Sequence, residues 1–190
     1  MEPIEPTLIE GFIRINKFFQ KHKIRYCLIG GIAAGYWGEP RFTHDMDFTV
    51  MSRTKGLQEI ARLLKKNGFK IVEQGADQLQ VVQHESFHFV ADLIFAATDY
   101  QDWVVQRAAV VPIFQVNVPI CSAEDLILLK LIANRRQDLV DIENVLKRHA
   151  SHLDQIYLKE WIRTWDLGER LRSEFGRDFY DFVQVVTDHE

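Results

Sequence analysis

The sequence predicts an α/β fold, in which helices flank a small mixed β-sheet and a C-terminal helical part follows. Up to about Ile120, short apolar runs with strand-like alternation recur between segments whose apolar residues have helical spacing. Beyond Ile120 only helical patterns continue. We therefore expect an α/β core with an N-terminal helix over residues 1–120, and a helical part over residues 121–190 that packs on this core as a single compact unit.

The helices are predicted from capping residues and apolar periodicity. Thr7 and Glu10 have the spacing of a capping box, Thr98 and Gln101 mark a further helix start, and Ser122 precedes a strongly periodic run. Ser52 is the expected cap of a further helix. The predicted helices cover residues 7–23, 32–37, 52–67, 98–108, 122–133, 139–146, 154–166 and 168–186.

The strands are predicted from alternation and from turn residues at their ends. The apolar run Tyr26–Ile29 stops at Gly30-Gly31, and a strand from Asp45 follows a turn at residues 38–40. Residues 69–73, 79–83 and 87–95 read as further strands, the last two joined around residues 84–86. Residues 110–120, which contain two prolines, are expected to form an edge strand or a hairpin.

Composition limits the classes of protein that this chain can belong to. Hydrophobic residues make up 47% of the 190 residues, enough to bury a sizeable core, so we expect an ordered domain. The formal net charge of −4 gives no global attraction to nucleic acid or to an anionic membrane. A polyanionic partner would therefore have to meet a local basic patch.

The cysteines and the apolar runs indicate a cytoplasmic protein without a membrane partner. Cys27 and Cys121 both lie in apolar surroundings, which favours buried free thiols in a reducing compartment over a disulfide. The acidic, proline-containing start of the chain is unlike a signal peptide. No apolar run reaches the roughly 20 residues needed to span a bilayer.

The most informative segment is the strand that carries Asp45 and Asp47. Met46, Phe48 and Val50 alternate with the two aspartates, so the carboxylates share one face of the strand and the apolar side chains share the other. The Cα atoms of Asp45 and Asp47 should lie about 6.5 Å apart. Like charges held this close favour a cation between them. Asp92, in an otherwise apolar strand, also calls for a partner or a metal ion.

In these residues the chain resembles the DNA polymerase beta-like nucleotidyltransferase superfamily, and within it the AbiEii-like and other minimal nucleotidyltransferases. The resemblance covers about residues 24–147. It rests on Gly30-Gly31 at a strand–helix junction, on the run Arg41-Phe42-Thr43-His44-Asp45-Met46-Asp47, and on Asp92 in a later strand. Members with transfer activity often have Ser at the second glycine, whereas Gly31 offers only its backbone N–H.

The resemblance implies a Mg²⁺-dependent enzyme that moves a nucleoside monophosphate from an NTP to a hydroxyl group. Asp45, Asp47 and Asp92 would be both the metal ligands and the catalytic residues. Two Mg²⁺ ions about 3.5–4 Å apart can hold the attacking and leaving oxygens, and Asp92 would serve the acceptor side. Gly30 and Gly31 would let the backbone approach the triphosphate at a helix N-terminus.

For several other residues the sequence leaves more than one possible role open. Arg41 either holds a phosphate or pairs with Asp45. Lys130, on an apolar helix, either contacts the triphosphate, as the resemblance suggests, or extends its amine to solvent. Asp138 and Asp141 match tail acids of AbiEii-like sequences, and they could orient Lys130 or take part in nucleotide binding. Asp138 could instead complement a helix N-terminus. We expect His44 to be structural.

A cluster of four basic residues later in the chain is the remaining candidate. It could form a patch that faces the acceptor, or it could be a solvated charge cluster, which we favour. The residues are Arg135, Arg136, Lys147 and Arg148.

Two function classes follow. The first is the nucleotidyltransferase, whose acceptor is an RNA end, a protein hydroxyl or a small molecule, and which could belong to a toxin–antitoxin pair with an antitoxin as partner. The alternative is a catalytically inactive nucleotide-binding sensor or scaffold of the same fold. All three aspartates favour the enzyme, and Gly31 keeps the alternative open.

Overall fold

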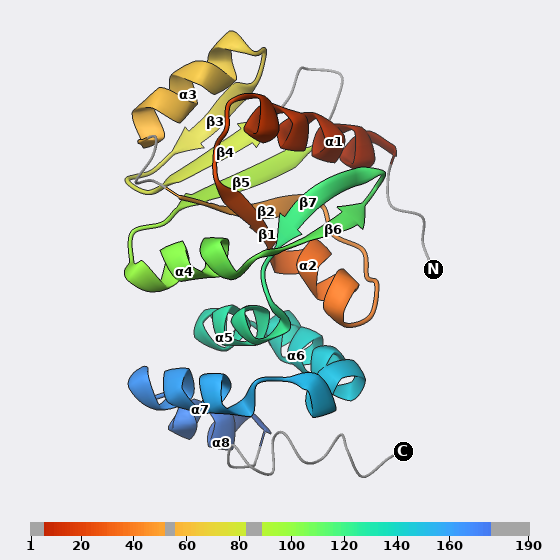
Figure 1. Ribbon diagram of the computed structural model, residues 1–190, viewed down its shortest axis with the longest axis vertical. Coiled ribbons are helices and arrows are strands. Elements are labelled where there is room, and N and C mark those ends of the chain that lie inside the picture. Colours follow the sequence, from red (N-terminus) through yellow and green to blue (C-terminus); the bar gives the residue numbers. More distant parts are fainter. Residues whose placement is uncertain (1–5, 52–55, 83–88, 176–190) are drawn as a thin grey trace. The chain divides into compact units, whose positions relative to one another are not determined.

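The computed structural model describes residues 6–51, 56–82 and 89–175, and it has an α/β architecture with a helical part (Figure 1). The helices are α1 (Pro6–Lys21), α2 (Gly30–Trp37), α3 (Leu57–Lys66), α4 (Asp99–Arg107), α5 (Ala123–Ala133), α6 (Arg136–His149), α7 (Gln155–Thr164) and α8 (Gly168–Phe175), with a 3₁₀ turn, η1 (Ala150–His152). The strands are β1 (Tyr26–Ile29), β2 (Asp45–Val50), β3 (Lys70–Gln74), β4 (Gln78–Val82), β5 (Val90–Phe95), β6 (Ala109–Ile113) and β7 (Val116–Ile120).

The seven strands form one mixed sheet in the order β3-β4-β5-β2-β1-β7-β6. Strand β2 lies at its centre, antiparallel to β1 and parallel to β5. Residues 109–120 form the hairpin β6–β7, and β6 is an edge strand of the sheet, as expected from the prolines. The sheet confirms the predicted mixed α/β fold.

The chain divides into two compact units. One comprises Met1–Ile32 and Arg41–Cys121, and the other Ala33–Pro40 and Ser122–Glu190. The first unit contains the sheet with α1, α3 and α4. The second contains α5 to α8 and also residues 33–37 of α2, which no pattern in the sequence assigned to the helical part.

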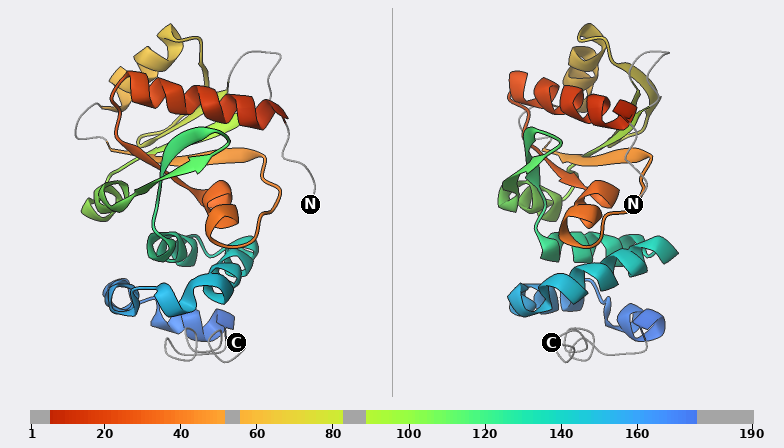
Figure 2. Two further views of the ribbon diagram at one scale, coloured as in Figure 1. Left: turned by 45° about the vertical axis from the view of Figure 1, so that its right-hand side comes forward. Right: turned by 90° about the vertical axis from the view of Figure 1, so that its right-hand side faces the viewer.

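Helices α1 and α3 cover one face of the sheet and α4 packs against the other, on β1 and β2 (Figure 2). The face under α1 is built from aromatic rings. Phe48 of β2 contacts Phe12 and Phe19 of α1, with ring centroids 6.2 and 5.4 Å apart, and Tyr26 of β1. This core holds the register of β2, because a slip by one residue would exchange its buried and exposed side chains.

The helical unit has a core of its own. Helix α5 packs against α6 and α7. The end of α2 lies against α6, where a Cβ added at Gly38 would come within 3.1 Å of the Asn144 Cβ. In both units the described residues include no helix with the length and the apolar character needed to cross a membrane.

Two of the capping predictions agree with the structure, but the one at Thr7 is wrong, because α1 already includes Pro6 and Thr7 therefore lies inside the helix. Thr98 and Gln101 form the capping box of α4, and the Ser122 hydroxyl accepts from the Asp125 N–H at the start of α5. Helix α3 begins at Leu57, after Gly56, and the predicted cap Ser52 lies outside the described residues, as do the turn at residues 84–86 and the end of the last predicted helix.

Cys27 and Cys121 are both buried free thiols, as predicted. Both lie in the unit that contains the sheet, where the Cys121 N–H donates to the Leu28 carbonyl at 3.0 Å.

Candidate active site

Strands β2 and β5 bring three carboxylates together on one face of the sheet. Asp47 lies directly opposite Asp92 in the parallel pairing, and Asp45 is two residues before Asp47 on the same face. One ligand oxygen from each of Asp45, Asp47 and Asp92 can be chosen so that all lie within 4.8 Å of one another. The three side chains are partly exposed, so a bound ion or substrate could reach them.

The opposite face of the same strands is apolar and fully buried. Met46 and Phe48 of β2, and Ala91 and Leu93 of β5, have no solvent exposure. Because side chains alternate along a strand, burial of these residues forces the aspartates onto the other face. The apolar pattern, rather than an interaction among the acids, therefore positions the three carboxylates.

Two neighbouring side chains donate hydrogen bonds to this group. The Thr43 hydroxyl donates to Asp45 Oδ1 at 2.9 Å, and the Gln80 amide donates to Asp92 Oδ1 at 3.0 Å. Gln80 lies on β4 opposite Asp92. Each bond stabilises a carboxylate close to like charges and restrains its orientation. No motif in the sequence points to Gln80, since only the pairing of β4 with β5 brings it to the site.

The glycine pair fits closely around the acidic strand. Gly30 has φ +66°, and a Cβ built there would lie 1.8 Å from Asp47 Oδ2. A Cβ on Gly31 would lie 2.7 Å from the Thr43 hydroxyl oxygen and 3.3 Å from Arg41 Nη2. From the sequence we expect these glycines to let the backbone approach a triphosphate. The structure gives them a second role, because their missing side chains make room for Asp47 and Thr43.

Arg41 and His44 flank the acidic strand. The Arg41 guanidinium lies beside Gly31, and its Nη1 donates to the Phe42 carbonyl at 3.1 Å. His44 is exposed, and its ring packs edge-on against Phe42 with centroids 4.4 Å apart. Arg41 therefore places positive charge next to the N-terminus of α2, whereas His44 belongs to a surface aromatic pair.

In the helical unit Lys130 is buried, so the interpretation in which its amine extends to solvent is wrong. Its side chain is 4% exposed, and Nζ lies 2.8 Å from Asp138 Oδ1 and 2.6 Å from Asp141 Oδ2. An amine that has left water needs carboxylates of this kind, because desolvation of an unpaired charge is costly. Asp138 and Asp141 thus hold Lys130 in place.

Asp138 also closes the start of α6. Its Oδ2 accepts from the Arg135 backbone N–H at 3.1 Å and from Arg135 Nε at 2.8 Å. Burial alone would raise the pKa of Asp138, but hydrogen bonds from Arg135 and Lys130 and the charge of Lys130 outweigh it and lower this pKa below its ordinary value. Asp138 therefore lies in the first turn of α6, where its charge complements the helix N-terminus, and it also contacts Lys130.

Two of the four clustered basic residues are engaged within the helical unit. Arg135 pairs with Asp138, and Arg148 donates from Nη1 to the Gly38 carbonyl. They are not merely solvated charges, although each keeps an exposed part.

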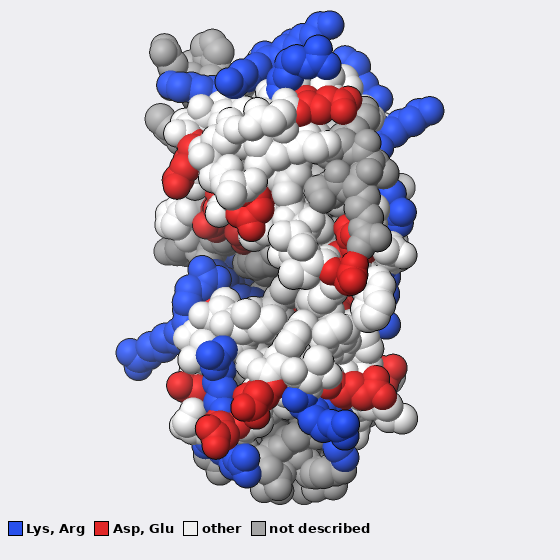
Figure 3. All heavy atoms as spheres, turned by 90° about the vertical axis from the view of Figure 1, so that its left-hand side faces the viewer, with Lys and Arg blue, Asp and Glu red and all other residues white. Residues whose placement is uncertain are grey.

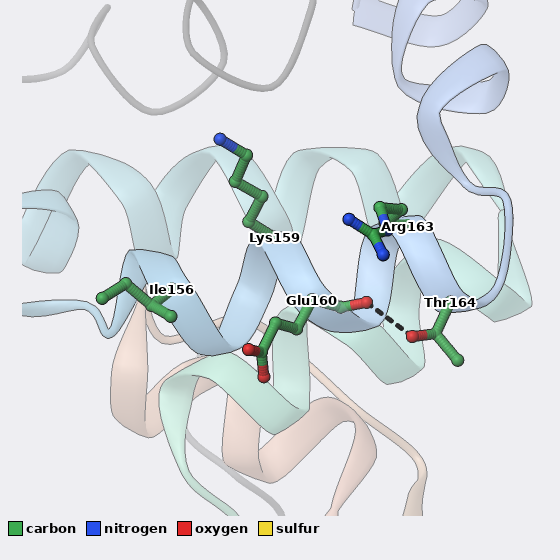
Figure 4. A pocket seen from close by; sticks show the side chains of 5 residues that line it. All are labelled: Ile156, Lys159, Glu160, Arg163 and Thr164. Carbon is green, nitrogen blue, oxygen red and sulfur yellow. Dashed lines mark hydrogen bonds between the residues drawn. The ribbon is translucent and has the colours of Figure 1, made fainter.

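A surface hollow on α7 differs in composition from the acidic site on β2 and β5. Five residues of one helix line it, namely Ile156, Lys159, Glu160, Arg163 and Thr164 (Figure 4). These lining residues include one carboxylate and no glycine turn, so this hollow lacks the group of acids found on β2 and β5.

Comparison with known proteins identifies the class of fold. No protein-family model matches the chain, and no curated protein matches it in sequence. Solved structures do match, and several of them are nucleotidyltransferases, among them a lincosamide antibiotic adenylyltransferase and the Megavirus polyadenylate synthase. The fold of this chain is therefore the nucleotidyltransferase fold.

Three of these structures show the extent of the similarity. ANT(2")-Ia in complex with adenylyl-2"-tobramycin has a TM-score of 0.61 at 12% identity, over 84% of this chain and 97% of that chain. The lincosamide antibiotic adenylyltransferase LnuA, bound to lincomycin, has a TM-score of 0.53 at 17% identity, over 75% and 96%. An antigenic nucleotidyltransferase-like protein from Paracoccidioides brasiliensis has a TM-score of 0.52 at 20% identity, over 76% and 78%.

Proposed function

We propose that this protein is a Mg²⁺-dependent nucleotidyltransferase that transfers a nucleoside monophosphate from an NTP to a hydroxyl group. The observation that carries the proposal is the convergence of Asp45, Asp47 and Asp92 beside a glycine turn on a nucleotidyltransferase fold. The AbiEii-like subgroup and a place in a toxin–antitoxin pair remain predictions from the sequence resemblance.

The donor set fits magnesium. Mg²⁺ prefers carboxylate, water and phosphate oxygens, and the three aspartates offer only oxygen ligands within 4.8 Å of one another. Asp45, Asp47 and Asp92 would hold the metal, which supplies charge neutralisation for the phosphates and lowers the cost of forming the nucleophile.

The other residues of the site have roles that follow from their contacts. Thr43 and Gln80 restrain Asp45 and Asp92. The N–H groups at the start of α2, which begins at Gly30, can bind phosphate oxygens. Arg41, beside Gly31, can add a charged contact to the same phosphates.

The reaction needs a proton acceptor at the attacking hydroxyl. The acceptor oxygen bonds to the α-phosphorus of the NTP while the bond to pyrophosphate breaks, and we assign the hydroxyl proton to Asp92. The Gln80 amide donates to Asp92 Oδ1, so this hydrogen bond leaves Asp92 Oδ2 to accept the hydroxyl proton. Lys130, and Asp138 through it, remain proposed contributors to triphosphate binding.

The ligands of two similar structures bear on the identity of the acceptor. LnuA is bound to lincomycin and ANT(2")-Ia carries an adenylyl group on tobramycin, so in both the partner of the nucleotide is a small molecule. We propose a small-molecule hydroxyl as the first acceptor class to test, followed by an RNA end and a protein hydroxyl.

The test uses each labelled NTP with cell extract divided into small-molecule, RNA and protein fractions, in Mg²⁺ or in EDTA. We expect one fraction to gain label in Mg²⁺ alone. Asp45→Asn and Asp47→Asn should lower transfer by at least about 10²-fold, with an unchanged or higher melting temperature, because neutralising one of several adjacent carboxylates relieves repulsion. Asp77→Asn, an exposed acid in the β3–β4 turn, is the matched control. Near wild-type transfer by both site variants would disprove the assignment.

A nucleotide-binding module without chemistry is the second candidate, and Gly31 favours it because it offers no side-chain hydroxyl to a phosphate. Asp92→Ala separates the two functions. In an enzyme this variant should keep the affinity for a non-hydrolysable NTP within a few-fold while transfer falls by about 10²-fold. Wild-type protein that binds NTP tightly and labels no fraction would establish the module instead.

A further inference from the structure

Positive charge is concentrated on the two helices that cover the sheet face opposite the aspartates. Across residues 6–25 and 56–74 the chain has nine Lys and Arg and three Glu, a net charge of +6, whereas the whole chain carries −4 and the remainder therefore −10. All nine basic side chains are exposed. Figure 3 shows Lys and Arg gathered over α1 and α3. The α1–α3 basic surface is defined here by Arg14, Lys17 and Lys21 of α1 and by Arg62, Lys65 and Lys66 of α3.

Contacts inside the first unit join the two helices at this surface. Lys21 Nζ donates to Asn67 Oδ1 at 3.3 Å, where Asn67 is the C-cap of α3, and the Asn67 amide lies 3.1 Å from His22 Nε2. The Arg14 guanidinium carbon lies 5.8 Å from the ring centroid of Phe69, which follows α3. The cations of α1 and α3 therefore form one surface rather than two separate helix ends.

Helix spacing places the basic residues of each helix on one side. Lys17 and Lys21 are four residues apart, as are Arg62 and Lys66, and same-sign pairs at this spacing destabilise a helix. The helix macrodipole accounts only for cations in the last turn, such as Lys21 and Lys65. Arg14, Lys17 and Arg62 lie earlier, so helix stability does not explain the cluster.

Three more cations lie next to the helices in sequence. Lys23 and Arg25 follow α1, and Lys70 begins β3 directly after α3. The step from Arg14 to Lys21 alone spans about 10 Å of helix. The surface is therefore wider than one phosphate group and suits a polymer with repeated charges.

The surface also lacks the apolar groups of a membrane-binding helix. Membrane-surface helices combine cations with exposed Trp, Phe or Leu. The exposed large apolar side chains among the described residues are Tyr36, Phe42, Val72, Trp103, Val110, Ile132, Val140 and Ile156, and none is on α1 or α3.

We propose that the α1–α3 basic surface binds the phosphate backbone of a nucleic acid strand. Its cations replace the counterions of the strand, and their release drives binding. The aspartates lie on the other face of the sheet, so this surface anchors the strand independently of the metal site, and binding there requires no transfer activity.

The test measures binding of labelled poly-U RNA and poly-dT DNA across a salt series. We compare wild-type protein with the triple variant Lys17→Gln, Arg62→Gln, Lys66→Gln and with a control of equal charge change in the helical unit, Lys147→Gln, Lys159→Gln, Arg163→Gln. Loss of three phosphate contacts should reduce the slope of log K against log salt by about 2 and raise Kd at least about tenfold at low salt. The control should remain within about two-fold of wild type.

Three outcomes would overturn the proposal. Wild-type protein could bind neither strand, or the control variant could lose as much affinity as the surface variant. Vesicles that contain phosphatidylserine could bind more tightly than either strand and respond to the same substitutions, which would assign the surface to a membrane. Melting temperatures of all variants, and their Mg²⁺·NTP affinity, show whether a loss comes from misfolding, so this result is separate from a failure of the proposed transfer activity.

Discussion

At the scale of single residues, Gly31 is the position at which this chain differs from the nucleotidyltransferase motif that its sequence resembles. Active members of the superfamily that the sequence resembles often have Ser here, but in this structure a Cβ would come within 2.7 Å of the Thr43 hydroxyl, which donates to Asp45. Glycine at this position and the Thr43–Asp45 hydrogen bond are therefore structurally linked. Gly31 is compatible with a metal site, and a serine would have to displace Thr43.

Gly31→Ser should consequently lower both the melting temperature and the affinity for Mg²⁺. Thr43→Ala removes the obstructing oxygen, so Gly31→Ser should cost much less stability in that background. A double-mutant cycle of unfolding free energies in urea measures this coupling, which we expect to be at least about 0.5 kcal/mol. Strictly additive effects would contradict the proposed contact.

Gln80 is a positioning residue for Asp92, because its amide donates to one carboxylate oxygen. Gln80→Leu should reduce kcat about tenfold, equivalent to about 1.4 kcal/mol of lost orientation, and leave the affinity for a non-hydrolysable NTP within about two-fold. Steady-state kinetics beside calorimetric titration measure the two quantities. Gln78→Leu, an exposed residue of the same strand, is the control. A loss of NTP binding equal to the loss in kcat would show that Gln80 acts on the fold instead.

At the scale of elements, the charged residues of the β2–β5 strand pair and those of the α5–α6 helix pair are positioned by different interactions. In the strands, one apolar face against α1 fixes where the aspartates lie. In the helices, buried charges pair with one another, since Lys130 of α5 reaches Asp138 and Asp141 of α6. The helix pair therefore depends on charge compensation more than the sheet does.

Lys130→Met should destabilise the helical unit by about 3–5 kcal/mol, because it removes the cation that two buried carboxylates share. Adding Asp138→Asn and Asp141→Asn should recover much of this loss. Denaturant unfolding of the three proteins provides the measurement, with Lys159→Met on the exposed side of α7 as control. If the free energy of unfolding falls by less than about 1 kcal/mol in Lys130→Met, water must solvate the two carboxylates in place of the amine.

The same cluster gives a pH dependence. The pKa of Asp138 is lower in the folded chain than its ordinary value, so its contribution to stability is complete above the unfolded pKa and is lost as the pH falls through the folded pKa. Acid unfolding below about pH 4 should therefore be less steep in Asp138→Asn than in wild-type protein. Parallel acid titrations followed by circular dichroism would reveal the difference, and identical slopes would contradict it.

At the scale of the whole molecule, charge is divided between the two sheet faces. The face with Asp45, Asp47 and Asp92 is acidic, and the helices on the opposite face carry the basic surface. The acidic face repels free nucleotide unless a cation neutralises it, so binding of NTP should depend on metal in a way that binding of a nucleic acid strand does not.

NTP with Mg²⁺ should accordingly raise the melting temperature more than NTP with EDTA. At a ligand concentration one hundred times Kd the gain corresponds to about 2.7 kcal/mol. A thermal-shift series with each NTP measures it, and Asp47→Asn should remove most of the metal-dependent part. Equal stabilisation with and without Mg²⁺ would point to an anion site away from the aspartates.

Local features of this protein can be predicted from its sequence alone. Alternation of Met46, Phe48 and Val50 with the acids assigned the faces of β2, and the capping residues Thr98 and Ser122 located two helix starts. These features follow from the periodicity of a single element and from hydrogen bonds over a few residues, so no knowledge of the fold is required.

Contacts between residues of different elements, in contrast, are known only from the tertiary structure. The pairing of β4 with β5 brings Gln80 to Asp92, the approach of α2 to β2 makes Gly31 depend on Thr43, and the packing of α6 on α5 encloses Lys130 between two acids. The hydrogen bond from Lys21 of α1 to Asn67 at the end of α3 likewise brings the cations of the two helices together in one surface. Each of these contacts joins residues from different elements, and the periodicity of one element does not specify which others will pack against it.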